Sequence, residues 1–182
     1  MPRSDWMGFL TIVAPAIAAN ALGAQTYPVS ERGSVTQTVA YTDISIFYGR
    51  PSARGRELFG HLVAWDDVWH PGADSATRIV FSRDVMLEGH AVKAGEYSIW
   101  MIPREKAPWT FILSRSAHVF HRNYPGADQD ALRVDVTPQR ATFMETMTWW
   151  FPSVQRDEAT LGFQWGEIML PLRIQAPNHP AS

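Results

Sequence analysis

The chain has 182 residues, no cysteine and a formal net charge of −2, with 46% hydrophobic and 12% aromatic residues. The length suits one domain, since domains commonly hold ~100–200 residues. The missing cysteines exclude disulfides, thiolate metal ligands and a thiol nucleophile. The near-zero net charge provides no general attraction to nucleic acid, whereas the hydrophobic content is sufficient for a packed core. We therefore predict one globular domain without a nucleic-acid partner.

The first 24 residues have the order of a secretory signal peptide. Arg3 precedes an apolar stretch over residues 6–19, and small residues follow up to Ala24. This stretch is shorter than the ~20 apolar residues that a membrane span needs. We predict a signal peptide over residues 1–24, with cleavage after Ala24 and a competing site after Ala21. An uncleaved anchor is the alternative, because Asp5 weakens the basic start. The mature chain has no second apolar run, so we expect a periplasmic or secreted protein without a membrane span.

From Ser34 onward, short alternating runs of apolar and polar residues are separated by turn residues. Alternation with a period of two indicates strands. The first two runs flank a turn at residues 42–43, and Glu88-Gly89 has the composition of a tight hairpin turn. Pro171 lies inside the last run and indicates an edge strand, since proline cannot donate to a ladder.

The predicted strands cover residues 35–41, 44–48, 76–82, 85–87, 97–102, 109–113, 132–136, 143–151, 161–165 and 168–174. About nine or ten short strands predict an all-β domain, an antiparallel β-sandwich or a barrel-like fold, over residues 25–182. Sustained helical periodicity is missing, although residues 57–62 are compatible with one helical turn.

The longest segment without a clear strand, residues 50–74, begins with three arginines, Arg50, Arg54 and Arg56. Arginine forks suit carboxylates, phosphates and sugar hydroxyls. One interpretation is therefore an anion or glycan contact. The other is that these arginines pair with nearby acidic residues and fasten the loop.

The same segment continues with Trp65, Trp69, His70 and Asp74. Tryptophan stacks on ligand planes, His70 can act as an acid or base near neutral pH, and Asp74 can orient it. Alternatively, both tryptophans cap the core and His70 bonds to the backbone. The ligand-binding candidates are Arg50, Arg56, Trp69, His70 and Asp74.

His118 and His121 form the closest histidine pair in the sequence. Spacing of three residues can place both rings on one face of a helical turn, but a structural metal site typically needs four ligands. We therefore predict no metal site, with this pair as a weak candidate. The sequence has no nucleophile elbow, phosphate-binding glycine loop or His-Glu-x-x-His motif, so we predict no cofactor and assign no reaction.

The motifs together resemble the bacterial family called domain of unknown function 2911. The resemblance spans roughly residues 34–174 and rests on Arg50-Pro51-Ser52, Gly55-Arg56, Phe59-Gly60, Leu62-Val63, Trp69, Gly72-Ala73, Ala76-Thr77, Ile79, Phe81-Ser82, Ala94-Gly95, Tyr97-Ser98, Ile102-Pro103, Trp109-Thr110, Ala159-Thr160-Leu161 and Trp165. It implies an exported, mostly β protein and no particular reaction. The sequence departs from the family pattern at His70, where the pattern has arginine, and at Asp74, where it has asparagine.

These observations favour a ligand-binding or structural module of the cell envelope, with an unknown small molecule or an envelope component as its partner. A hydrolase that uses His70 or His121 as a base is an alternative. A protein-interaction module that uses the aromatic run Trp149-Trp150-Phe151 is another.

Overall fold

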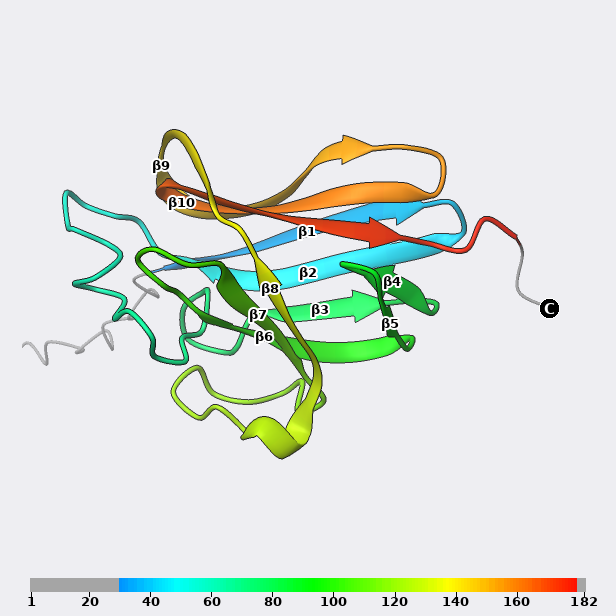
Figure 1. Ribbon diagram of the computed structural model, residues 1–182, viewed down its shortest axis with the longest axis horizontal. Coiled ribbons are helices and arrows are strands. Elements are labelled where there is room, and N and C mark those ends of the chain that lie inside the picture. Colours follow the sequence, from blue (N-terminus) through cyan, green and yellow to red (C-terminus); the bar gives the residue numbers. More distant parts are fainter. Residues whose placement is uncertain (1–29, 180–182) are drawn as a thin grey trace, which may run out of the picture.

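Ten strands form two antiparallel sheets in the computed structural model, which describes residues 30–179 (Figure 1). The strands are β1 (Glu31–Val39), β2 (Thr42–Arg50), β3 (Arg78–Phe81), β4 (Val85–Leu87), β5 (His90–Val92), β6 (Gly95–Ile102), β7 (Trp109–Ser114), β8 (Asp130–Val136), β9 (Gln139–Val154) and β10 (Glu158–Gln175). The strand order is β1-β2-β3-β6-β7-β8 in one sheet and β5-β4-β10-β9 in the other. A 3-10 turn at Ala127–Gln129 precedes β8.

The core lies between the two sheets. The six-stranded sheet contributes buried residues such as Ile46 and Phe111, and the four-stranded sheet contributes residues such as Leu161 and Phe163. Alternate side chains of β2 point into this layer, as period-two patterning requires. The prediction of an all-β sandwich with about ten strands is confirmed, and the described residues form two separate sheets rather than a closed barrel.

The two tightest hairpins differ in how well the sequence predicted them. At Glu88-Gly89 the turn is confirmed, with φ of 50° and 79°, because a two-residue hairpin turn of this type needs positive φ at both positions. The expected turn at residues 42–43 is wrong: Val39 pairs with Thr42, and the turn lies at residues 40–41. Ala40 adopts a φ of 51° there, a conformation that its residue type does not indicate.

The last two predicted strands are a single strand, β10. Its register against β9 shifts around Gly166, which has a φ of 59°, so a bulge bends the strand instead of ending it. The edge-strand prediction for Pro171 is also wrong, because β10 lies between β4 and β9. The ladder to β9 ends at Met169 and the ladder to β4 begins at Ile174, so the missing N–H of Pro171 costs no ladder bond.

The long connection between β2 and β3, residues 51–77, lies at the left-hand end of the sandwich in Figure 1. It places the rings of Phe59, Trp65 and Trp69 against those of Trp109 and Trp165. The expected helical turn at residues 57–62 is an irregular turn. Because of these ring contacts, the connection closes one end of the core and carries polar loop residues outside it.

Across residues 30–179, helices long and apolar enough to cross a membrane are absent.

Candidate functional site

A pocket of about 410 Å³ opens where this connection meets the segment that follows β7. We call it the loop pocket. Its described lining residues are Ser30, Pro51, Ser52, Arg54, Arg56, Leu62, Val63, Trp69, Gly72, His121, Arg122 and Trp165. Its size is within the usual range of small-molecule sites.

The guanidinium of Arg56 is held in place by the loop itself. Its Nε donates to the carbonyl oxygen of Ala53 at 2.9 Å, and one terminal nitrogen donates to that of Ser52 at 2.6 Å. A guanidinium has five N–H donors, so three remain for a ligand. Because the loop already orders the Arg56 side chain, little side-chain entropy of Arg56 would be lost when a ligand binds.

Two tryptophans from distant parts of the chain form the apolar part of the pocket. Trp69 stacks on Trp165 with 6.3 Å between ring centroids and 7° between ring planes. The backbone of Trp69 exchanges two hydrogen bonds with Met101 of β6 at 2.7 and 2.8 Å. The sequence left open whether Trp69 caps the core or contacts a ligand. Trp69 packs on the core and also lines the pocket, so its position is compatible with both roles.

His70 and His121 lie side by side, with 6.1 Å between ring centroids. The His70 ring is buried, and its Nε2 accepts the backbone N–H of Thr77. Burial, with a smaller contribution from the charge of His121, lowers the pKa of His70 to about 3. His70 therefore stays neutral near pH 7 and its acceptor nitrogen is occupied, so it cannot readily take a proton.

His121 is more accessible and lines the loop pocket. Its Nδ1 bonds to the carbonyl oxygen of Asp74, which can only accept, so Nδ1 carries the proton. In the neutral ring, Nε2 is then an acceptor. Of the two histidines that the sequence offered as a base, His121 is the one placed to act on a bound molecule.

Of the five predicted ligand-binding candidates, the structure brings Arg56 and Trp69 together in the lining. Arg50 turns toward β9, where it donates to the carbonyl oxygen of Met147 at 3.4 Å and to the hydroxyl of Thr148 at 3.2 Å. Asp74 has a φ of 64° and contacts His121 through its backbone carbonyl. Arg50, His70 and Asp74 thus lie around the pocket without lining it.

The two weak metal candidates are separated. His118 pairs with Glu96 at 2.9 Å on the outer face of the six-stranded sheet, whereas His121 faces the loop pocket. Within residues 30–179, groups of three or more potential metal ligands are absent.

The sequence reasoning missed Arg122 as a site residue and left Arg54 out of the candidates. Arg122 follows His121 in a segment without strand periodicity, and the pairing that brings it to the pocket is long-range: Ser75 bridges Phe120. The adjacency of Arg122 to a candidate histidine was the available signal. Arg54 was visible as part of the three-arginine cluster.

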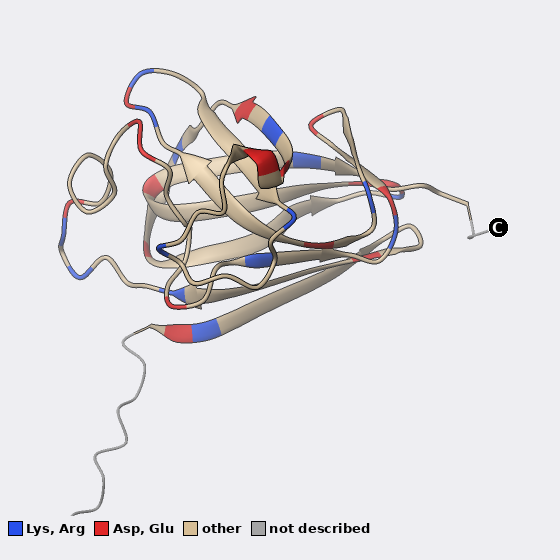
Figure 2. Ribbon diagram, turned by 90° about the horizontal axis from the view of Figure 1, so that it is seen from below, with Lys and Arg blue, Asp and Glu red and all other residues tan. Residues whose placement is uncertain are grey.

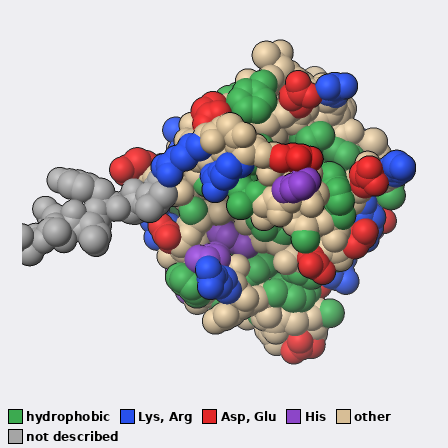
Figure 3. Space-filling model, turned by 90° about the vertical axis from the view of Figure 1, so that its left-hand side faces the viewer, with side chains coloured by type: hydrophobic (Ala, Val, Ile, Leu, Met, Phe, Trp, Pro, Cys, Tyr) green, Lys and Arg blue, Asp and Glu red, His purple; other side chains and the backbone are tan. Residues whose placement is uncertain are grey.

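The positive charge of the pocket is local. Arg54, Arg56 and Arg122 line it, and Asp and Glu are absent from its described lining. Figure 3 views this end of the molecule and shows recessed histidine side chains (purple) with basic side chains (blue) nearby. Elsewhere, basic and acidic residues are interspersed along the described ribbon (Figure 2), in keeping with the net charge of −2. The excess of basic over acidic side chains is therefore a property of the pocket lining and not of the whole chain.

A β-sandwich with a basic, tryptophan-walled pocket among the loops at one end defines the class of this protein. The chain belongs to the family described as "Protein of unknown function (DUF2911)", whose match covers residues 30–174. The resemblance noted in the sequence is thereby confirmed. No curated protein and no solved structure matches the chain.

Proposed function

We propose that this protein is an exported binding module for a small anion that carries at least two negative charges, such as a phosphorylated or polycarboxylate compound. The observation that carries the proposal is the lining of the loop pocket: basic side chains from two separate segments meet in about 410 Å³, without an acidic residue in the described lining. Arg56 belongs to the connection after β2 and Arg122 to the segment after β7.

The chemistry of the lining supports this class of ligand. Hydrogen bonds between guanidinium groups and carboxylates or phosphates are among the stronger ones in proteins, about 1.5–3 kcal/mol each. Trp69 and Trp165 provide an apolar wall against which the body of an organic anion can pack.

Calorimetric titration of the full-length chain with pyrophosphate and with citrate tests the proposal. We expect saturable binding of at least one of them at low ionic strength, weakening as salt is added. Arg56→Gln and Arg122→Gln should each raise the Kd by roughly tenfold or more, the equivalent of one charge-assisted hydrogen bond.

Arg140→Gln is the matched control. Arg140 is exposed on β9 and pairs with Glu167 at 2.7 Å, away from the pocket lining. The Arg140→Gln variant should bind as the wild type does. The proposal is refuted if neither anion binds, or if all three variants bind equally well.

A catalytic use of the pocket is a second candidate, because His121 lines it with Nε2 available as an acceptor in the neutral ring. Hydrolysis of p-nitrophenyl phosphate or p-nitrophenyl acetate that disappears in His121→Gln would support it. Equal background rates in both proteins would leave binding as the function.

Export rests on the predicted leader at residues 1–24, which lies outside the described residues. Expression in a Gram-negative bacterium followed by fractionation is the test. We expect a periplasmic or secreted product that begins at Gln25, or at Leu22 if the competing site is used. A cytoplasmic product that retains Met1 or Pro2 would contradict export.

A further inference from the structure

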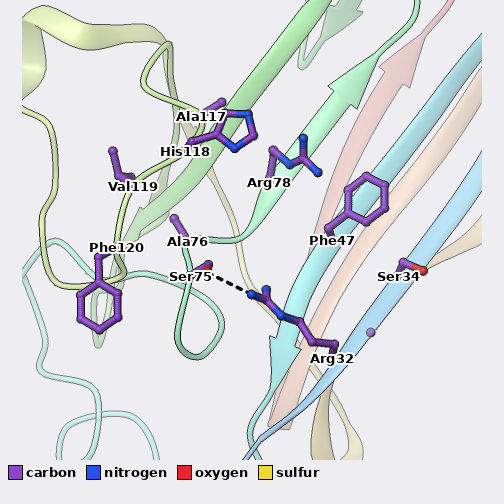
Figure 4. A pocket seen from close by; sticks show the side chains of 11 residues that line it. Arg32, Ser34, Phe47, Ser75, Ala76, Arg78, Ala117, His118, Val119 and Phe120 are labelled. Carbon is purple, nitrogen blue, oxygen red and sulfur yellow. Dashed lines mark hydrogen bonds between the residues drawn. The ribbon is translucent and has the colours of Figure 1, made fainter. Parts of the chain in front are cut away.

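A second concave surface lies on the outer face of the six-stranded sheet, and the proposed function does not use it. This groove has a volume of about 630 Å³ and lies between β1, β2 and β3 on one side and residues 117–120 on the other (Figure 4). Its far wall is fixed to the molecule, since the backbone N–H of Ala76 donates to the carbonyl oxygen of Val119 at 3.0 Å. We call it the sheet groove.

The sheet groove and the loop pocket are separate sites that share a wall. Ser75 and Phe120 line the groove, whereas Gly72 and His121 line the pocket. The Phe120 and His121 rings lie 4.2 Å apart between centroids, so the segment that carries them faces both cavities.

Arg32 provides an available cation in the groove. One of its terminal nitrogens donates to the hydroxyl of Ser75 at 3.0 Å, which directs the guanidinium across the groove from β1 (Figure 4). Within residues 30–179, no carboxylate forms an ion pair with Arg32. The remaining donors of this guanidinium match the two oxygens of a carboxylate.

Arg78 and Phe47 form a flat platform next to this cation. The guanidinium carbon of Arg78 lies 4.8 Å from the centroid of the Phe47 ring, and Glu96 accepts a hydrogen bond from Arg78 at 2.7 Å. Glu96 neutralises Arg78, so the platform offers stacking surface more than free charge.

Two aromatic rings of the groove are exposed to solvent. Phe47 is 38% exposed and Phe120 is 54% exposed. Together with Val119 they provide apolar surface on both sides of the groove. A ligand that covers these rings gains hydrophobic stabilisation in proportion to the area removed from water.

We propose that the sheet groove binds an organic carboxylate with an aromatic or apolar body. The carboxylate pairs with Arg32, and the body lies between the Arg78–Phe47 platform and Phe120. The ligand class differs from that of the loop pocket, where several cations converge and favour a compact ligand with more than one negative charge.

The test is titration of the isotope-labelled full-length chain with 3-phenylpropionate, phenylacetate and hexanoate, followed by NMR. 3-Phenyl-1-propanol serves as the uncharged partner of the first probe. We expect saturable shifts at residues 32, 47 and 120 with at least one of the acids. The alcohol should bind at least about fivefold more weakly than the acid, because it lacks the charge that pairs with Arg32.

Two groove variants and one pocket variant distinguish the parts of the proposal. Arg32→Gln should raise the Kd for the acid by roughly tenfold and leave the alcohol unchanged. Phe120→Ala should weaken the acid and the alcohol alike. Arg56→Gln, which alters only the loop pocket, should bind the acids as the wild type does.

Absence of saturable shifts with all three acids up to about 10 mM, a range that includes weak small-molecule binding, overturns the proposal. So does binding that Arg32→Gln leaves unchanged. The loop-pocket test uses pyrophosphate and citrate as probes and depends on Arg56 and Arg122, whereas the groove test uses monocarboxylates and depends on Arg32 and Phe120. Failure of the groove proposal therefore leaves the proposed function standing, and the reverse also holds.

Discussion

The surroundings of His70 lower its pKa and occupy its acceptor nitrogen. It accepts the Thr77 N–H, and the Thr77 hydroxyl in turn donates to the carbonyl oxygen of Pro71 at 2.8 Å. A Cβ on Gly72 would lie 2.4 Å from that hydroxyl oxygen and 2.8 Å from Cε1 of His70, so the position has no room for a side chain. His70 thus fixes the turn that carries the chain from Trp69 to β3.

The lowered pKa of His70 predicts a specific loss of stability in acid. The pKa is about 3 in the folded state and 6.5 in the unfolded state, so the unfolded state binds the proton more tightly. The neutral His70 ring therefore adds to the free energy of unfolding in full above about pH 6.5, and this stabilisation is lost as the pH falls toward 3. Its magnitude is on the order of a few kcal/mol.

Urea denaturation at about pH 7 and about pH 4 measures this loss. In His70→Gln the side-chain carbonyl still accepts the Thr77 N–H but does not titrate, so the difference in unfolding free energy between the two pH values should shrink. An unchanged difference would show that His70 does not titrate as its burial requires.

Arginines of one short motif have unlike partners, which the sequence could not reveal. Arg50 contacts Met147 and Thr148, almost one hundred residues away, whereas Arg56 bonds to carbonyls three and four residues before it. The concentration of arginines was visible in the sequence. Which of them lines the pocket depends on how β2 packs against β9, and local spacing carries no information about that packing.

The connection between β2 and β3 is positioned by a close approach to β2. A Cβ on Gly49 would lie 2.4 Å from the carbonyl oxygen of Ala73, a backbone atom that cannot move without shifting the turn around His70. Gly49→Ala should therefore destabilise the protein by about 1–3 kcal/mol and weaken pyrophosphate binding at the loop pocket.

Gly89→Asn is the control for Gly49→Ala. Gly89 has a φ of 79° with open space around it, and asparagine tolerates positive φ, so this variant should lose less than about 1 kcal/mol and bind normally. Thermal unfolding and calorimetry measure both effects. Equal stabilities of the two variants would show that the backbone around Ala73 can shift to accommodate a Cβ at Gly49 at no cost in stability.

Strand alternation was sufficient to predict the sandwich, and two of the errors fell where glycine or proline stands inside β10. Gly166 looked like a break between two strands, but it is a bulge over which a Cβ would lie 2.9 Å from Leu58 Cδ1. Pro171 looked like an edge, but the neighbouring ladders do not include it. Both outcomes depend on neighbouring strands far away in the sequence, and local pattern does not contain them.

The aromatic run at the end of β9 illustrates the same limit. Trp149 is buried in the core, and Trp150 covers Gly162 of β10, where a Cβ would lie 3.0 Å from its ring. These two rings are used within the molecule. The exposed large apolar side chains of β9 are Phe143 and Val154 instead.

Over the molecule as a whole, a cysteine-free sandwich carries one concave surface among its end loops and a second on the outer face of the six-stranded sheet, and the two differ in charge and apolar character. The core between the sheets holds the loops through the rings of Phe59, Trp65 and Trp69. Basic and acidic residues are interspersed along the described ribbon (Figure 2), so the proposed binding would depend on the local lining of each concave surface.

A crystal structure of the full-length chain with pyrophosphate is the most direct check on anion binding at the loop pocket. The ligand is expected in the pocket lined by Trp69 and Trp165, with phosphate oxygens within hydrogen-bond distance of the guanidinium groups of Arg56 and Arg122. Pyrophosphate bound elsewhere, or a loop pocket filled by water alone at saturating ligand, would contradict the account.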